Sequence, residues 1–231
     1  IKNETNLGMP GNLNNGISMA SGDLIINMHD ADCYFPELLE KAEAILLENE
    51  NMGLVFWAFT ENYLVDRGLQ KITNGRDFFR KHYAGQTSSK IWGTCMVRGE
   101  AIRKLMPFDE RFNAWADVDM WMRICLDWDV GYLSEPLAEL FKEEGQFRFW
   151  NWEKTLLIQS MFFLNILRHF EGEIQRKALA KQLSVQRILW WRFMLARIKH
   201  REWRKLFQGP RYFVKYHRMP ELVRLQEPLY S

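Results

Sequence analysis

Residues 23–33, DLIINMHDADC, constrain the fold more than any other stretch of the chain. An apolar run that ends in acidic residues is typical of a buried strand that delivers carboxylates to the edge of a sheet. Ligands of open α/β sheets bind outside the carboxyl ends of the strands. Asp30 and Asp32 are therefore predicted to share a hard divalent cation, Mg²⁺ or Mn²⁺. Because Asp-x-Asp is a weak motif, a solvated turn is the alternative interpretation.

Apolar periodicity along the first 145 residues alternates between the helical and the extended type. Helices are predicted over residues 11–20, 36–49 (with Leu38, Leu39, Ala42, Ile45 and Leu46 as its buried stripe), 100–105 and 117–127. Strands are predicted over residues 53–59, 91–97 and 130–133, the last one ended by a turn at residues 134–136. Residues 61–89 are polar and irregular, which indicates a long excursion over the edge of the sheet. The alternation predicts an α/β fold with a layered sheet.

Composition sets the broad class of the protein. With 231 residues, 47% of them hydrophobic and 26% charged, the chain can bury one sizeable core and carry an appended subdomain. Its three cysteines form no C-x-x-C pair, so neither a disulfide framework nor a zinc cluster is indicated, and a reducing compartment fits. The most apolar segment, residues 155–167, is too short to span a membrane. Because the chain opens on Ile1 within an α/β pattern, we expect that an N-terminal part is missing.

Charge is divided unevenly within the overall net charge of +2. Residues 168–224 are rich in Lys and Arg, whereas the rest of the chain carries net negative charge. We therefore expect two parts, residues 1–145 with local metal or nucleotide chemistry and residues 146–231 as a helical, basic, aromatic-rich tail.

Several short blocks occur in an order that resembles family 2 glycosyltransferases of the GT-A fold. The blocks are residues 6–17 (NLGMPGNLNNGI), residues 20–25 (ASGDLI) before the Asp-x-Asp motif, residues 108–112 (FDERF), residues 116–123 (ADVDMWMR) and residues 131–140. The resemblance covers residues 6–142. It departs from the family pattern at Leu13, where relatives often have Arg, at Ala116, where many have Glu, and at residues 142–144 (KEE), where an Arg-x-His motif is common.

The resemblance implies a partial GT-A catalytic domain that lacks the strands for the nucleotide base. It implies an inverting transfer of a sugar from a nucleoside-diphosphate-sugar, with a UDP-sugar as the expected donor, to a hydroxyl of a glycan or lipid-linked acceptor in cell-surface polysaccharide assembly. The implied roles are metal and donor binding by Asp30 and Asp32, donor binding by Asn14 and Gly16, a general base at Asp117, and acceptor-side contacts by Trp115 and Asp119.

The chemistry of such a transfer fits these residue types. A divalent cation stabilises the charge that develops on a leaving diphosphate. A carboxylate near the acceptor hydroxyl can take its proton as the new bond forms. The alternatives are that Asp117 only caps a helix and that Asp119 only pairs with Arg123 four residues later. If the strand continued through the motif, His29 would point away from Asp30, so it is assigned no metal role.

The tail predicts a membrane partner. Residues 187–207 interleave large apolar side chains with Lys, Arg and His, which is typical of a helix lying in a membrane interface. The expected location is the cytoplasmic face of the cell membrane, and packing of the same stripe against the body is the alternative.

Two other function classes stay open. One is a phosphotransferase or phosphatase with Asp30 as nucleophile; the other is a non-enzymatic polyanion-binding protein, although nucleic acid is not the expected partner.

Overall fold

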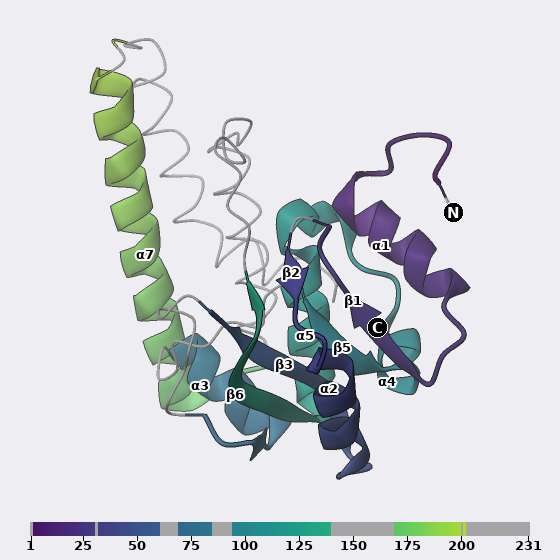
Figure 1. Cartoon of the computed structure of the whole chain (residues 1–231). Helices are drawn as coiled ribbons and strands as arrows, with labels where there is room; N and C mark the ends of the chain where they lie inside the picture. The colour runs from purple at the N-terminus through teal and green to yellow at the C-terminus, as the bar shows by residue number, and fades with distance from the viewer. Residues whose placement is uncertain are drawn as a thin grey trace. The chain divides into compact units, whose positions relative to one another are not determined.

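The computed structural model describes residues 2–30, 32–60, 69–84, 94–139, 169–199 and residue 201 (Figure 1). Contacts divide the chain into two units, Ile1–Arg148 and Phe149–Ser231.

The first unit is built on a mixed sheet of six strands. Its strands are β1 (Leu24–Asn27), β2 (Cys33–Tyr34), β3 (Met52–Phe59), β4 (Ile72–Thr73), β5 (Cys95–Arg98) and β6 (Asp129–Glu139). Their order in the sheet is β1-β5-β3-β6-β2, and β4 also pairs with β6. Only β3 and β6 run parallel to each other among these described pairs. The predicted α/β class is confirmed.

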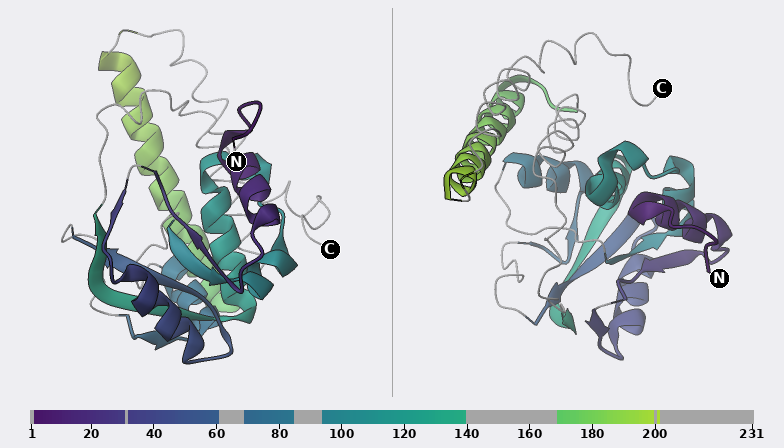
Figure 2. Two further views of the ribbon diagram at one scale, coloured as in Figure 1. Left: turned by 45° about the vertical axis from the view of Figure 1, so that its right-hand side comes forward. Right: turned by 90° about the horizontal axis from the view of Figure 1, so that it is seen from above.

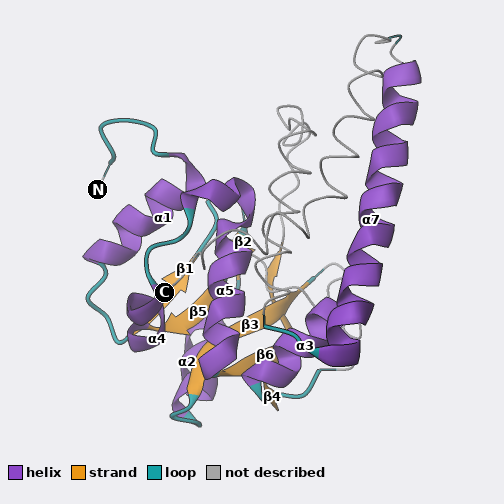
Figure 3. Ribbon diagram, turned by 180° about the vertical axis from the view of Figure 1, so that it is seen from behind, coloured by secondary structure: helices purple, strands orange, loops and turns teal. Residues whose placement is uncertain are grey.

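Helices cover both faces of this sheet. They are α1 (Gly8–Met19), α2 (Leu38–Leu47), α3 (Gly75–Ala84), α4 (Gly99–Leu105), the 3-10 helix η2 (Glu110–Trp115) and α5 (Ala116–Asp127). Helix α2 packs on one face, and α3, α4 and α5 pack on the opposite face, as views from the front and from behind show (Figures 1 and 3).

The central strand β3 explains why the unit is stable. All eight of its residues are buried, because helices cover the sheet on both sides. Val55, Trp57 and Phe59 belong to the cluster that packs against α2. Phe56 points to the other face, where its ring lies 5.7 Å from that of Phe78 in α3. Alternate side chains of one strand thus anchor two helical layers.

The predicted bounds of two elements differ from the bounds in the structure. Strand β1 has only four residues, one of them buried, and it ends at Asn27, so the predicted buried strand that reaches Asp30 is wrong. Helix α1 starts at Gly8, three residues before the predicted start. In α2 the prediction for Leu39 is also wrong, because its side chain is 54% exposed.

The polar excursion predicted over residues 61–89 is wrong where the structure describes it. It contains β4 and α3, and α3 buries Phe78, Phe79 and Tyr83. Asn74 starts this helix, since its side-chain oxygen accepts the Asp77 N–H at 3.3 Å. Residues 61–68 and 85–93 lie outside the described part of the chain, and so does the start of the strand predicted from residue 91.

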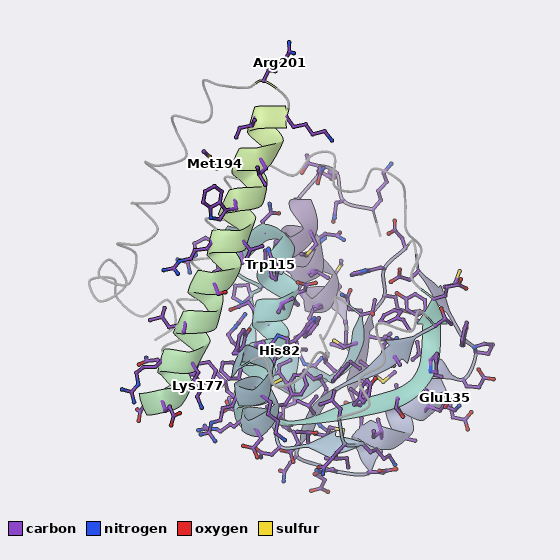
Figure 4. The ribbon with its side chains drawn as sticks, turned by 90° about the vertical axis from the view of Figure 1, so that its left-hand side faces the viewer. His82, Trp115, Glu135, Lys177, Met194 and Arg201 are labelled. Carbon is purple, nitrogen blue, oxygen red and sulfur yellow. The ribbon has the colours of Figure 1, made fainter. Side chains whose placement is uncertain are left out.

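The turn predicted at residues 134–136 is wrong, since β6 runs through it. The pairing with β3 shifts there from Trp57↔Leu133 to Ala58↔Pro136, which is a bulge. A bulge accommodates proline because extra residues leave the ladder at that point. Strand β6 curves along its length (Figures 1 and 2), and Glu135 at the bulge accepts hydrogen bonds from Lys41 Nζ of α2 at 2.6 and 2.7 Å (Figure 4).

The second unit contains one long helix in its described part, α7 (Gly172–Lys199), which has 28 residues. Lys177 lies near its start and Met194 in its last turns (Figure 4). None of the helices described in the structure has the length and apolar character needed to cross a bilayer.

Candidate functional site

The Asp-x-Asp motif lies on a tight turn that follows β1. The Asp32 N–H donates a hydrogen bond to the His29 carbonyl at 3.3 Å, which closes a four-residue turn. Tyr34 holds this turn from β2, because its hydroxyl oxygen accepts the His29 N–H at 2.7 Å. The same hydroxyl lies 3.3 Å from the His29 carbonyl and 3.4 Å from Asp32 Oδ2. The turn therefore depends on one tyrosine two residues after the motif.

The two motif carboxylates have different surroundings as a result. Asp30, at the second position of the turn, is exposed. The Asp32 side chain, at the fourth position, is only 5% exposed and faces Tyr34 and His29. The pKa of Tyr34 is raised to about 12, mainly because its hydroxyl is buried and also because the Asp32 carboxylate lies close to it. The tyrosine therefore stays a neutral hydrogen-bonding partner of the turn at physiological pH.

A cavity of about 680 Å³ opens beside this turn. Three separate parts of the chain line it: residues in the stretch 3–13 leading into and forming the start of α1, residues 27–30 after β1, and Asp117 of α5. The structure thus brings Asp30 and Asp117, which are far apart in the sequence, to one pocket. Asp32 and Trp115 do not line it.

Asp117 is a buried carboxylate at the start of α5. It is 9% exposed, and its Oδ1 accepts the backbone N–H of Val118 at 2.6 Å. Burial raises the pKa of Asp117 above its ordinary value of 3.8, while the Val118 N–H and the nearby His29 act in the opposite direction. Asp117 therefore satisfies a backbone N–H in the first turn of α5 and also presents a carboxylate of increased basicity to the pocket.

Asp119 is held in the interior. Its Oδ2 binds Arg123 Nε at 2.8 Å, and both side chains are largely buried. Arg123 also donates to the carbonyls of Leu105 at 2.6 Å and Pro107 at 3.4 Å, so the pair ties α5 to the segment after α4. The predicted i,i+4 pair is present, and these contacts favour a structural role for Asp119 over the acceptor-side role expected from the resemblance.

Asn14 also has a structural position. Its side-chain amide donates to the Phe108 carbonyl at 3.0 Å and accepts the Phe108 N–H at 2.6 Å, which fastens α1 to the segment before η2. Neither Asn14 nor Gly16 lines the pocket. Trp115 immediately precedes α5 (Figure 4) and is half-buried.

Sequence reasoning did not single out the polar wall of the pocket. Asn3, Asn6 and Asn12 line it. Asn3 donates to Asn12 Oδ1 at 2.8 Å and accepts from Asn15 Nδ2 at 2.6 Å, while Asn6 Oδ1 accepts the Gly8 N–H at 2.9 Å. The asparagine-rich composition of residues 3–15 was the available signal, since amide side chains bind polar ligands and each other equally well.

The prediction that His29 points away from Asp30 rests on a wrong assumption. That assignment assumed a strand through the motif, and β1 ends at Asn27. His29 lines the same pocket as Asp30 and Asp117. Its Nδ1 lies 3.7 Å from Asp32 Oδ2, because the first and fourth residues of a tight turn come close together.

The residues present fit a divalent cation that is shared with a phosphate ligand. Within the described ranges, no group of three or more His, Cys, Asp or Glu side chains is placed to hold a metal ion. Mg²⁺ sites in phosphate chemistry, however, usually use one or two carboxylates and complete the shell with phosphate and water oxygens. Asp30, which is exposed and lines the pocket, meets that requirement, whereas the neighbouring Asp32 is largely buried beside it.

Comparison with known proteins gives a consistent result. Residues 1–106 match the family model described as Glycosyl transferase family 2. An uncharacterized glycosyltransferase of Methanocaldococcus jannaschii is 28% identical over 146 residues, which are 60% of this chain and 49% of that protein. EpsE of Bacillus subtilis, which bears the name of a glycosyltransferase, is 27% identical over 154 residues, 64% of this chain and 54% of that protein.

The chain spans about half the length of these curated relatives. Among solved structures, that of residues 1–349 of TarS from S. aureus aligns with a TM-score of 0.54 and 14% identity, covering 76% of this chain and 50% of that one. At this identity the likeness shows the fold alone, and it confirms the predicted GT-A-like architecture.

Proposed function

We propose that the protein transfers a sugar from a nucleoside-diphosphate-sugar to a hydroxyl of a glycan or lipid-linked acceptor, because residues 1–106 match the family model of glycosyl transferase family 2. A UDP-sugar is the donor we expect. The observation that carries the proposal is the pocket itself, in which the exposed Asp30 of the motif turn and the buried Asp117 of α5 meet.

The three carboxylates divide between two tasks in this mechanism. Asp30 and Asp32 would hold a Mg²⁺ or Mn²⁺ ion, which supplies positive charge to the leaving diphosphate. Asp117 takes the proton of the acceptor hydroxyl as that oxygen bonds to the anomeric carbon and the bond from this carbon to the diphosphate breaks. Attack opposite the leaving group inverts the configuration. The raised pKa of Asp117 makes it a stronger base than an exposed carboxylate.

A screen of nucleotide sugars tests this proposal. The purified protein is incubated with UDP-, GDP- and dTDP-sugars, with Mn²⁺ or Mg²⁺ and with glycan or lipid-linked acceptors, and the nucleoside diphosphate and the glycosylated product are measured by mass spectrometry. Asp117→Asn should abolish most of the product, whereas Asp77→Asn, a change on the exposed surface of α3, should not. Hydrolysis of generic phosphoesters without sugar transfer would favour the phosphatase alternative.

We also propose that α7 attaches the protein to the cytoplasmic face of a membrane. Ile188, Trp191, Leu195 and Ile198 recur at intervals of three and four residues and are all exposed, with Trp191 at 60%. Exposed basic residues, Arg187, Lys199 and Arg201, lie beside them. These four side chains occupy the last three turns of α7. A short apolar stripe with flanking cations suits an anionic lipid surface.

A further inference from the structure

We propose that the sugar ring bound in the pocket of Asp30 and Asp117 is uncharged, and that Asn12 selects it by donating a hydrogen bond to one of its hydroxyl groups. The inference rests on the proposed function, because it names the substrate class of that same pocket. It excludes uronic acids and other acidic sugars. The same chemistry holds for the transferred sugar and for an acceptor sugar, and the experiment below distinguishes the two.

A chain of three amide side chains fixes the orientation of Asn12. Asn15 Nδ2 donates to Asn3 Oδ1 at 2.6 Å, and Asn3 Nδ2 donates to Asn12 Oδ1 at 2.8 Å. Because the oxygen of an amide accepts and its nitrogen donates, the direction of each bond orients the next side chain. Asn12 therefore turns its oxygen toward Asn3, and its Nδ2 has no bonding partner within the described residues.

Asn6 presents the same kind of group. Its Oδ1 accepts the Gly8 N–H at 2.9 Å, and among the described residues its Nδ2 has no acceptor. Both Asn6 and Asn12 are exposed and line the pocket. The wall formed by the residues before α1 and by the first turns of α1 therefore offers hydrogen-bond donors to a ligand.

The carboxylates of the pocket offer acceptors. Asp30 and Asp117 line it, and its described lining contains no Lys or Arg. A sugar ring carries several hydroxyl groups, each of which both donates and accepts, so it can bond to the amides and to the carboxylates. A carboxylate or phosphate group on the ring would instead meet the charge of Asp117 without a basic partner. A cation held by Asp30 would be neutralised by the diphosphate and would leave that charge in place.

The apolar part of the lining suits the faces of a sugar ring. Leu7 and Met28 line the same pocket and are 45% and 44% exposed. Sugar rings carry C–H groups on their faces, and contact with these groups would remove the two apolar side chains from water. The cavity volume of about 680 Å³ is typical of a small-molecule site.

Saturation transfer difference NMR on the full chain tests the inference, because it detects weak binding of sugars and needs no turnover. The probes are the methyl glycosides of glucose, galactose, mannose and N-acetylglucosamine, and those of glucuronic and galacturonic acid. Asn12→Asp keeps an oxygen that accepts from Asn3 but replaces the donor by an anionic acceptor, and Asn12→Lys adds a cation. Asn51→Asp is the matched control, since Asn51 is exposed and does not line the pocket.

We expect a neutral glycoside to bind to the wild type and to Asn51→Asp, and the uronic acids to bind more weakly by on the order of 10-fold. Asn12→Asp should weaken the binding of the neutral glycoside by about 10-fold or more, because the hydrogen bond to the hydroxyl is lost. Asn12→Lys should shift the preference toward the uronic acids. Circular dichroism verifies that each variant is folded.

Titration with UDP-glucose and with UDP, each with Mn²⁺, distinguishes the two sources of the sugar. If Asn12→Asp weakens the binding of UDP-glucose and not that of UDP, the inference is supported and the pocket holds the transferred sugar. If UDP-glucose binds equally to Asn12→Asp and the wild type while the methyl glycoside binds more weakly to the variant, the inference is supported and the pocket holds the acceptor.

The results that would overturn the inference differ from those that would overturn the proposed function. Equal affinity for uronic and neutral glycosides, equal binding by Asn12→Asp and the wild type, or no binding of any neutral glycoside would each contradict the inference, even if the donor screen detects sugar transfer. Binding of a neutral glycoside that depends on Asn12, without transfer from any donor, would support the inference and contradict the proposed function.

Discussion

At the scale of single residues, Asp117 combines a contact inside its own helix with a place in the pocket wall. Its oxygen satisfies a backbone N–H at the start of α5, which is what a capping residue does, and the same side chain reaches the pocket. The burial that raises its basicity also makes its charged form costly to the fold. A substitution that removes the charge of Asp117 is therefore expected to lower activity and to raise stability.

Replacing Asp117 by Asn tests this opposition. The transfer rate should fall by on the order of 10²-fold or more, the usual contribution of a general base. Because the pKa is raised in the folded state, the stability that Asp117 contributes is present below 3.8 and is lost as pH rises through the folded-state pKa. Asn keeps an acceptor for Val118, so the variant should melt at a higher temperature than the wild type at pH 7.

The difference in melting temperature should shrink as the pH is lowered toward 4, since the wild-type carboxyl then takes up its proton. Scanning calorimetry from pH 4 to 8 measures it, with Asp77→Asn as the exposed control. An unchanged melting temperature at pH 7 together with near-normal turnover would leave Asp117 as a helix cap only.

Tyr34 should matter to the motif turn. In Tyr34→Phe the His29 N–H loses its partner, and the free energy of unfolding should fall by about 1 kcal/mol at pH 7. Since the folded-state pKa of Tyr34 is about 12 against an ordinary value of 10, its contribution is lost as pH rises from 10 to 12. The stability of the wild type should therefore decline more steeply over this interval than that of Tyr34→Phe. Urea titrations at pH 7, 10 and 11.5 give both results, and parallel curves would contradict the burial of the hydroxyl.

At the scale of elements, the contact between α3 and α5 leaves no room at Gly75. A Cβ atom there would lie 1.8 Å from the Trp128 carbonyl oxygen and 2.3 Å from that of Cys125. Gly75→Ala should therefore force the two helices apart and lower the free energy of unfolding by about 3 kcal/mol.

Gly16→Ala is the matched control for this change. Nothing lies within 4 Å of a Cβ at Gly16 in α1, so alanine there should stabilise the protein by about 0.5–1 kcal/mol through helix propensity. Chemical denaturation of the two variants measures both values. Equal destabilisation would show that α1 and not the α3–α5 contact limits stability.

The elements that the sequence predicted well share a physical property. Strand β3, α2 and α5 bury most of one face or both faces, so their apolar periodicity is strong. Helix α3 was missed because its buried aromatic residues stand in a polar stretch of the sequence and pack against α5 and the sheet, which are distant in the sequence. Strand β6 was predicted too short because a bulge, which depends on pairing with β3, accommodates Pro136.

Part of the candidate site could also be predicted. Asp30 was singled out by its motif and Asp117 by the resemblance, and the structure brings both to one pocket. The partners of Asn14 and Asp32 could not be predicted, since no periodicity in the sequence indicates that Asn14 contacts Phe108 or that Asp32 contacts Tyr34.

At the scale of the whole molecule, we expect the second unit, and not the first, to bind lipid. Co-sedimentation with vesicles that contain anionic lipid should retain the full chain, and high salt should weaken this binding because it screens the basic residues. The double change Trp191→Ser and Leu195→Ser should reduce binding strongly. Leu47→Ser, which alters an exposed leucine of α2, should not.

Two outcomes would contradict the role of α7 in membrane attachment. Binding that is indifferent to the charge of the lipid would exclude the electrostatic part. Equal retention of the double variant and the wild type would mean that the apolar stripe contacts protein.

The hydrogen bonds between Asn14 and Phe108 join residues that are 94 positions apart. During synthesis the motif turn can close as soon as Tyr34 has left the ribosome, because all its bonds are local. The pocket has to wait until Phe108 and Asp117 have emerged. Residues 1–106, the segment that the family model matches, therefore contain the motif turn but lack Asp117 and Phe108, so they cannot complete the pocket by themselves.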